Sequence, residues 1–143
     1  MTVFRNGHTF TLALRCQPPR GHFPPAVAVE MAGASTEFVP VIGKVDTGAF
    51  RTMLSFETAE RLGIHDPTSS ARRTATAHTA TGEPFRYWVH VVSIRIAGGA
   101  EGAIEFPLMA AFADQVERNL FGVDWLEHLC LAVDRQAVHF LKD

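Results

Sequence analysis

A single aspartate stands where a short apolar run meets a turn, within the stretch Val41 to Ser55. The run that ends at Val45 predicts a strand, and that strand would hold the carboxyl group of Asp46 at its end. Gly48 lets the backbone turn sharply and present its N–H groups to the carboxylate. Thr47 places beside the acid a hydroxyl group that both donates and accepts hydrogen bonds. A carboxylate held in this way is suited to taking up and returning a proton during hydrolysis.

The tripeptide Asp46-Thr47-Gly48 also has a simpler interpretation, a tight surface turn, because aspartate and glycine both favour turns. The flanking residues argue against a solvated turn. Val41 and Val45 precede the tripeptide, and Met53 and Leu54 follow it. Apolar residues on both sides predict that the turn lies between two buried segments. We therefore interpret this acid as the candidate catalytic group.

The elements that must position this acid are mostly short strands. Alternating apolar and polar residues predict strands over 9–15, 26–31, 38–45 and 85–97, and another through Ile104, Phe106 and Leu108. Segments 72–79 and 85–97 flank the turn residues 80–84 and should form a hairpin. Ser55 is a predicted N-cap for a helix over 56–62 that stops before Gly63.

The C-terminal part predicts one more short helix and two more strands. The helix is expected over 124–129, and the strands over 131–134 and 137–141. Many short strands with only two short helices indicate an all-β barrel or sandwich. The fold class by itself does not choose a function, because unrelated activities share such folds.

Two segments resemble those of a known family. The pattern Asp-Thr-Gly-Ala-x-x-Thr-x-Leu-Ser at 46–55 resembles the active-site segment of retropepsin-like aspartic proteases, which include retroviral proteases and a domain of eukaryotic DNA-damage-inducible proteins. The segment Asn119-Leu120-Phe121-Gly122-Val123-Asp124-Trp125-Leu126 is similar to the family's apolar-apolar-Gly-x-Asp-x-Leu segment. The resemblance runs from about Val41 to Leu141 and leaves residues 1–40 unmatched. It implies a retropepsin-like β-barrel protomer in a single domain over 1–143.

The resemblance also implies roles for individual residues. Asp46 would be catalytic, Thr47 would bond across a dimer axis, and the backbones of Gly48 and Ala49 would contact acid and substrate. The hairpin tip would act as a flap over the cleft, and a strand would pass beside the catalytic turn. The remaining implied residues are Ala80, Thr81 and Gly82 for the flap, Phe50 for the cleft, and Leu120, Phe121 and Gly122 for that strand. Phe121 departs from the family because a smaller aliphatic residue is usual there.

The number of acids sets the expected assembly. The sequence holds one Asp-Thr-Gly, whereas this kind of peptide hydrolysis needs two facing carboxyl groups. A two-fold homodimer supplies the second, since it places each residue opposite its mate. Two carboxyl groups in contact share one proton, so one acts as base towards a water while the other acts as acid. We expect no covalent intermediate, metal or cofactor.

Composition bounds the remaining possibilities. The chain has 143 residues and a formal net charge of −2, so nothing indicates binding to nucleic acid or to an anionic membrane. No apolar run is long enough to cross a membrane, and the N-terminus lacks a signal pattern. We predict a cytoplasmic protein in which Cys16 and Cys130 are reduced.

Other functions stay open from the sequence. A catalytically silent dimer of the same fold would bind a peptide or partner, although such a binder would tolerate an amide in place of the Asp46 carboxyl. A monomeric barrel would bind a small molecule without dimerising. His78 and His90 lie in the predicted hairpin strands, where a partly exposed structural histidine is the commoner case than a general base.

Overall fold

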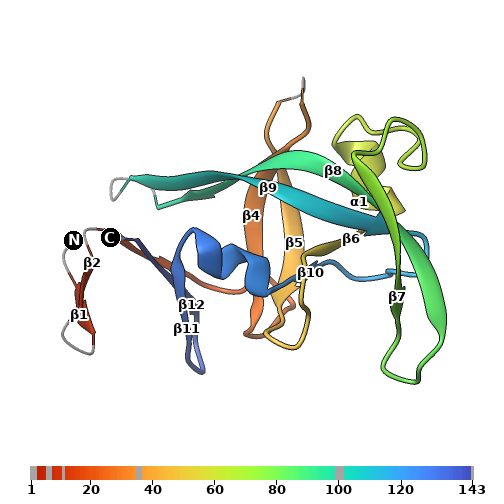
Figure 1. Ribbon diagram of the computed structural model, residues 1–143. Helices are drawn as coiled ribbons and strands as arrows, with labels where there is room; N and C mark the ends of the chain where they lie inside the picture. The colour runs from red at the N-terminus through yellow and green to blue at the C-terminus, as the bar shows by residue number, and fades with distance from the viewer. Residues whose placement is uncertain (1–2, 6–7, 11, 35–36, 99–101, 143) are drawn as a thin grey trace.

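Figure 1 shows a computed structural model of the chain, which is built almost entirely from strands. The structure describes residues 3–5, 8–10, 12–34, 37–98 and 102–142. Within these ranges the elements are β1 (Val3–Arg5), β2 (His8–Phe10), β3 (Leu12–Cys16), β4 (Ala26–Ala32), β5 (Val39–Val45), β6 (Met53–Ser55), α1 (Phe56–Arg61), β7 (Arg73–His78), β8 (Pro84–Ala97), β9 (Ala103–Ala113), β10 (Leu120–Phe121), the short 3₁₀ helix η2 (Val123–Glu127), β11 (Cys130–Val133) and β12 (Val138–Lys142). The predicted all-β class is confirmed.

The main sheet has the strand order β4-β5-β10-β6-β9-β8-β7. Strand β4 also pairs with β8 through Glu30–Ala32, so the sheet curls back towards itself. The expected barrel is nevertheless not closed, because β4 reaches β8 over this short stretch alone and β7 extends beyond β8 as one arm of a hairpin. Strand β10 enters parallel to β5 and antiparallel to β6.

The core lies inside this curled sheet, and the alternation in the sequence predicted its long strands correctly. Val92, Ile94 and Ile96 point inward from β8 and are buried. The hydroxyl group of Ser55 caps α1 by accepting a hydrogen bond from the backbone of Thr58 at 3.1 Å. No helix in the described part of the chain is both long and apolar enough to span a membrane.

The N-terminal segment differs from the prediction of one strand over 9–15. Residues on the two sides of position 11, which is outside the described ranges, pair with different partners: β2 pairs with β1, and β3 pairs with β12 in a separate sheet of order β11-β12-β3. An alternating pattern predicts which residues share one face of a strand, but it does not predict the neighbouring strand. One continuous pattern therefore covers two separate strands here.

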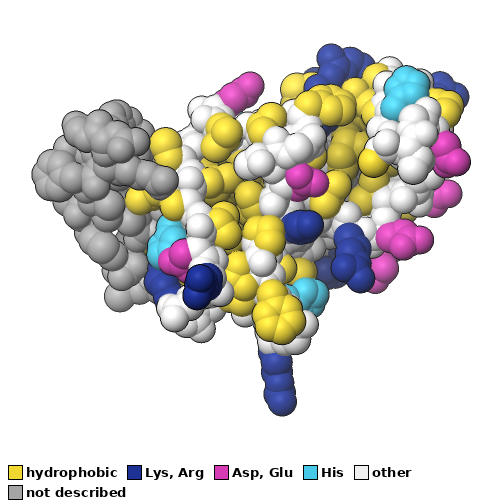
Figure 2. All heavy atoms as spheres, turned by 90° about the horizontal axis from the view of Figure 1, so that it is seen from below, with side chains coloured by type: hydrophobic (Ala, Val, Ile, Leu, Met, Phe, Trp, Pro, Cys, Tyr) yellow, Lys and Arg dark blue, Asp and Glu magenta, His cyan; other side chains and the backbone are white. Residues whose placement is uncertain are grey.

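Several turns lie on the same side of the molecule. The end of β5, the tip of the β7–β8 hairpin and the β11–β12 turn all lie at the bottom of Figure 1. Figure 2 views the molecule from that side and shows apolar side chains exposed between scattered charged ones. A face of this kind is typical of an interaction surface.

Candidate active site

The turn at the end of β5 holds Asp46 by its own backbone. The N–H group of Gly48 donates to Asp46 Oδ1 at 2.9 Å, and the N–H group of Ala49 donates to the Asp46 carbonyl at 3.1 Å. A Cβ atom at Gly48 would lie 3.1 Å from Asp46 Oδ1, so glycine gives the carboxylate room. Asp46 is half-buried, while Thr47 and Gly48 are exposed. Among the described residues no other group bonds to the carboxylate, whose second oxygen is thus free to act on a ligand.

Strand β10 lies directly beside this turn. Leu120 pairs with Lys44, and Phe121 pairs with Val45. The N–H group of Asp46 donates to the Phe121 carbonyl at 2.9 Å. The structure therefore brings together two sequence segments far apart in the chain, and Asp46 is fixed by both its own turn and β10.

Gly122 follows β10 directly and packs closely against the backbone of the active-site turn at Ala49 and Arg51. A Cβ atom there would lie 2.6 to 2.7 Å from the backbone of Arg51 and from the carbonyl oxygen of Ala49. The next residue, Val123, donates its N–H group to that same Ala49 carbonyl at 3.0 Å. Only glycine allows this approach, so the two predicted motifs interlock at Gly122.

A buried polar network locks the interlocked segments. Asp124 accepts two hydrogen bonds from Thr52, one from its N–H group at 2.9 Å and one from its hydroxyl group at 2.8 Å. The Thr52 hydroxyl oxygen also accepts from the N–H group of Gly122 at 3.2 Å. Thr52 is fully buried, so each of these polar groups needs its partner. The network fixes the return of the active-site turn against η2.

Asn119 is a positioning residue that sequence reasoning did not single out. Its Oδ1 accepts from the N–H group of Ser55 at 2.9 Å and from the hydroxyl group of Thr58 at 3.1 Å. Its Nδ2 donates to the carbonyl of Ile42 at 2.9 Å. The side chain thus ties β5, β6 and α1 together behind the acid. The only signal in the sequence was its place at the start of the second motif.

The unusual Phe121 is accommodated by a glycine on β5. A Cβ atom at Gly43 would lie 2.4 to 2.8 Å from the outer atoms of the Phe121 ring. The other face of the ring stacks on Trp125, with ring centroids 4.6 Å apart. The larger side chain behind the acid therefore fits because residue 43 has no side chain.

One strand of the hairpin, β8, contacts the residues that follow the turn through Tyr87. Gly82 at its tip has a φ of +87°, as its predicted place in a turn requires, and Ala80, Thr81 and Gly82 are exposed. Phe50 meets Tyr87 of β8 edge-on at 6.5 Å between ring centroids. No hydrogen bond or ring contact in the described ranges joins the tip to Asp46. Phe50, rather than the tip, connects the turn with the hairpin in this structure.

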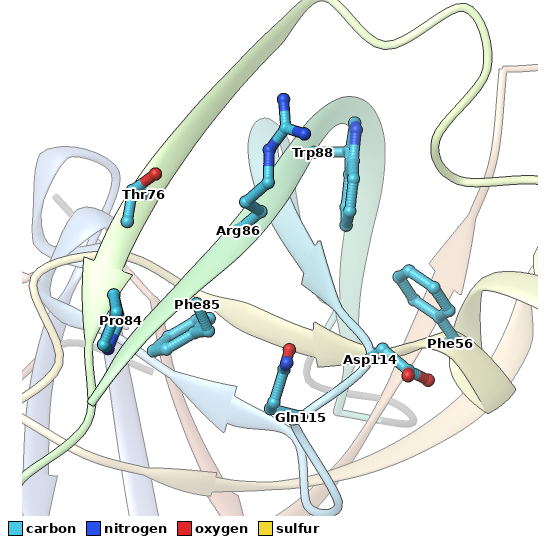
Figure 3. Close-up of a pocket in the computed structure, with 8 residues that line it drawn as sticks. All are labelled: Phe56, Thr76, Pro84, Phe85, Arg86, Trp88, Asp114 and Gln115. Carbon is cyan, nitrogen blue, oxygen red and sulfur yellow. The ribbon is translucent and has the colours of Figure 1, made fainter.

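Two hollows border the hairpin. One, of about 590 Å³, lies between β8, the start of α1 and the end of β9 (Figure 3), where Trp88 and Phe56 pack at 5.9 Å between ring centroids. Asp46 does not line it. The other, of about 570 Å³, is lined by Phe50 and Arg51 of the active-site turn and by residues of β8, β9 and η2. Asp46 does not line this second groove either, but Phe50 and Arg51, which follow the acid in the same turn, do.

The histidines of the hairpin stay outside the acid site. His90 Nε2 lies 2.6 Å from the Pro67 carbonyl, and its ring meets Phe112 edge-on at 5.6 Å. His78 is exposed. The contacts of His90 fit a structural role, and the exposed His78 has no contact with Asp46 among the described residues.

Comparison with known proteins identifies the family. Residues 27–128 match the family described as "gag-polyprotein putative aspartyl protease". The chain belongs to this aspartyl protease family. The match includes both motifs around Asp46 and Gly122, and it begins earlier than the segment that resemblance alone picked out. No curated protein sequence matches the chain significantly.

Comparison with solved structures shows that this chain shares its fold with two aspartic proteases. A retropepsin-like aspartic protease from Rickettsia conorii matches with a TM-score of 0.58 and 21% identity, covering 91% of this chain and 90% of that one. EIAV protease, solved in complex with the inhibitor HBY-793, matches with a TM-score of 0.52 and 18% identity, covering 76% of this chain and 89% of that one. The retropepsin-like fold predicted from the sequence is thus confirmed.

Proposed function

We propose that the protein is a dimeric aspartic endopeptidase, in which a water is activated between two Asp46 carboxyl groups, one from each protomer. The observation that carries this proposal is the held carboxylate at the end of β5, with one oxygen bonded to Gly48 and the other free. The family membership supports the same chemistry. One such acid per chain makes two copies necessary.

The proposed reaction moves protons and forms no covalent bond to the enzyme. The ionised Asp46 takes a proton from the water, whose oxygen attacks the carbonyl carbon of the scissile bond. The protonated Asp46 of the partner subunit donates to the developing oxyanion. The tetrahedral intermediate then collapses and the C–N bond breaks. The leaving nitrogen receives a proton from the carboxyl that had taken one from water, and the partner's carboxylate takes back a hydroxyl proton as the new carboxyl group forms.

The residues around the acid have supporting roles in this proposal. Thr47 is exposed at the turn and is available to bond with its mate across a two-fold axis. The backbones of Gly48 and Ala49 bond to Asp46 and would also contact the substrate. The β7–β8 hairpin would close over an extended peptide, with the tip residues Ala80, Thr81 and Gly82 excluding water. An extended substrate would pair with exposed backbone and place alternate side chains in pockets.

The dimer also has edges through which it can form. Strands β11 and β3 are the outer strands of the C-terminal sheet, so each has one edge without a neighbour in the described part of the chain. Val133 on β11 and Leu126 on η2 are about half exposed. Open edges and exposed apolar side chains favour pairing with a second copy.

The test is cleavage of a mixed peptide library by the purified chain at acidic and neutral pH. We expect both fragments of each cleaved peptide among the products. We also expect activity that falls faster than linearly, and hence a falling specific activity, as the enzyme is diluted through its dimer dissociation constant. Specific activity independent of dilution, together with a monomer by sedimentation, would contradict the shared site. Peptide binding without cleavage would instead support a silent binding module.

A further inference from the structure

Exposed apolar side chains converge on the groove beside the active-site turn. Phe50 is 60% exposed, Met109 is 48% exposed and Val91 is 38% exposed, and all three line this groove of about 570 Å³. Pro107 and Val123 add further apolar surface. Large apolar side chains gathered in one concave site mark a binding surface rather than chance exposure.

The groove continues one face of the hairpin strand β8. Tyr87, Val89 and Val91 alternate along β8 and share one face of the sheet. Tyr87 and Val89 are covered, whereas Val91 and its β9 partner Met109 are open. Val91 and Met109 therefore extend this face of β8 into the groove that Phe50 and Arg51 also line.

Arg51 contacts the buried Tyr87 and also lines the open groove. Its guanidinium carbon lies 5.8 Å from the centre of the Tyr87 ring, and its side chain lines the groove. Its Nη1 is buried and has no hydrogen-bond partner in the part of the chain that the structure describes. Burial without an acceptor is costly for a charged donor, so an anion that reaches the guanidinium would relieve this cost.

Asp124 and Glu127 line the same groove, but neither carboxylate pairs directly with this guanidinium in the described part of the chain. Both oxygens of Asp124 accept hydrogen bonds from Thr52. Glu127 also lines the groove, yet no carboxylate among the described residues lies within ion-pair distance of Arg51. The guanidinium is held by an aromatic ring, which fixes its plane and leaves its charge for a ligand.

We propose that this groove is a distal subsite of the substrate cleft, with an apolar floor for one substrate side chain and with Arg51 as the residue that selects an adjacent aspartate or glutamate. The inference rests on the proposed function, since it takes the occupant to be the substrate polypeptide. Arg51 is then a specificity-determining residue. Its planar fork matches a carboxylate with two parallel hydrogen bonds, which a glutamine amide of the same shape reproduces poorly.

The first experiment reads the preference from cleavage. Products of a random decapeptide library are sequenced for wild type, Arg51→Met and Arg51→Glu, with folding checked by thermal melts. We expect Asp and Glu to be enriched about tenfold over Gln at one fixed distance from the scissile bond, which corresponds to the selectivity of a charge-assisted pair. The enrichment should vanish in Arg51→Met and reverse towards Lys in Arg51→Glu. Arg20→Met is the control, because Arg20 is exposed and lines neither hollow, and it should keep the acidic preference.

The second experiment is independent of turnover. Fluorescein-labelled decapeptides that differ only as Glu, Gln or Lys are titrated into the Asp46→Asn protein, with and without Arg51→Met. Tighter binding of the Glu peptide that Arg51→Met abolishes supports the subsite even if wild type proves inactive. Active enzyme with no acidic enrichment overturns the subsite while the protease function stands. Arg51 variants that weaken dimerisation and leave the peptide preference unchanged also overturn it, because the guanidinium would then serve the partner copy.

Discussion

The carboxylate of Asp124 bonds Thr52 twice, to its N–H group at 2.9 Å and to its hydroxyl group at 2.8 Å, across a long separation in sequence. This pair joins the segment after the acid to η2. Removing the carboxylate in Asp124→Ala leaves buried donors of Thr52 without partners, which should cost about 1–3 kcal/mol in the free energy of unfolding. Asp124→Asn should cost less, because its oxygen can accept from the Thr52 N–H group while its amide donates to the hydroxyl oxygen. Chemical denaturation measures both, and an Ala variant as stable as wild type would contradict the role of the pair.

A second prediction concerns the close packing of Gly43 and Phe121. Gly43→Ala places a Cβ atom inside the contact distance of a ring that is already stacked on Trp125. We expect a loss of about 1–3 kcal/mol in the free energy of unfolding from overpacking. Phe121→Leu combined with Gly43→Ala should recover part of that loss, so the two changes would be less than additive in a double-mutant cycle. Strict additivity would show that the ring does not limit residue 43.

The third prediction separates flap function from backbone strain. Gly82 has a φ of +87° and Gly21 has a φ of +83°, and a Cβ atom at either would meet nothing within 4 Å. Valine at either position should therefore cost similar stability, about 1–2 kcal/mol, through the left-handed backbone alone. Only Gly82→Val should also impair turnover, since only Gly82 lies at the hairpin tip. Equal turnover in the two variants would place the flap elsewhere.

The fourth prediction is a pH dependence at the C-terminal hairpin. His139 Nε2 lies 2.8 Å from Asp134 Oδ2, and this contact, followed by the N–H groups of Gln136 and Ala137, lowers the pKa of Asp134 from 3.8 to about 2. The folded state thus favours the ionised carboxylate. Its stabilising effect is fully present above about pH 4, near the ordinary value of an aspartate, and is lost as the pH falls through about 2. Added salt should weaken it, because the carboxylate is exposed.

The measurement for Asp134 is an NMR titration of its carboxyl group in wild type and His139→Ala. We expect the pKa of Asp134 to rise towards its ordinary value when the imidazole is removed, and to stay below it because the two backbone N–H groups remain. His65→Ala is a suitable control, since His65 pairs with Glu60 on another surface. An unchanged titration in His139→Ala would exclude the imidazole as the main cause.

The sequence predicts well what depends on local pattern. The turn at Asp46, the N-cap at Ser55 and the positive φ at Gly82 each follow from residue types with strong local preferences. The strands of the main sheet follow from alternation. The placement of Leu120 to Gly122 beside the turn came only from resemblance, because nothing local indicates a parallel partner.

Long-range polar contacts could not be predicted in this way. The sequence around Asn119 predicts only a loop. Its hydrogen bonds to Ser55, Thr58 and Ile42 form because the fold brings three distant segments together. The fit of Phe121 against Gly43 is similar, since a glycine inside a strand pattern does not say which ring approaches it. The division of residues 9–15 between β2 and β3 was missed because pairing partners leave no trace in alternation.

The last prediction concerns the acid itself. Asp46→Asn keeps the shape of the side chain and an oxygen that can accept from Gly48, so the turn should persist. An amide cannot take the proton of a water, so hydrolysis should fall to background while the fold and peptide binding remain. Stability at neutral pH should not fall, because the substitution removes repulsion between two facing carboxyl groups in the proposed dimer.

Covalently linked dimers make this test specific for a shared site. A linked dimer of one wild-type and one Asp46→Asn chain should be nearly inactive, because base and acid come from different chains in the proposed mechanism. Two independent sites would instead leave the mixed dimer with about half of the wild-type activity, as each intact chain would work alone. The measurement is cleavage of one fluorogenic peptide by the wild-type, mixed and double-mutant linked dimers at equal concentration. Half activity in the mixed dimer would rule out the shared site, and wild-type activity in the double mutant would mean that Asp46 is only a turn residue.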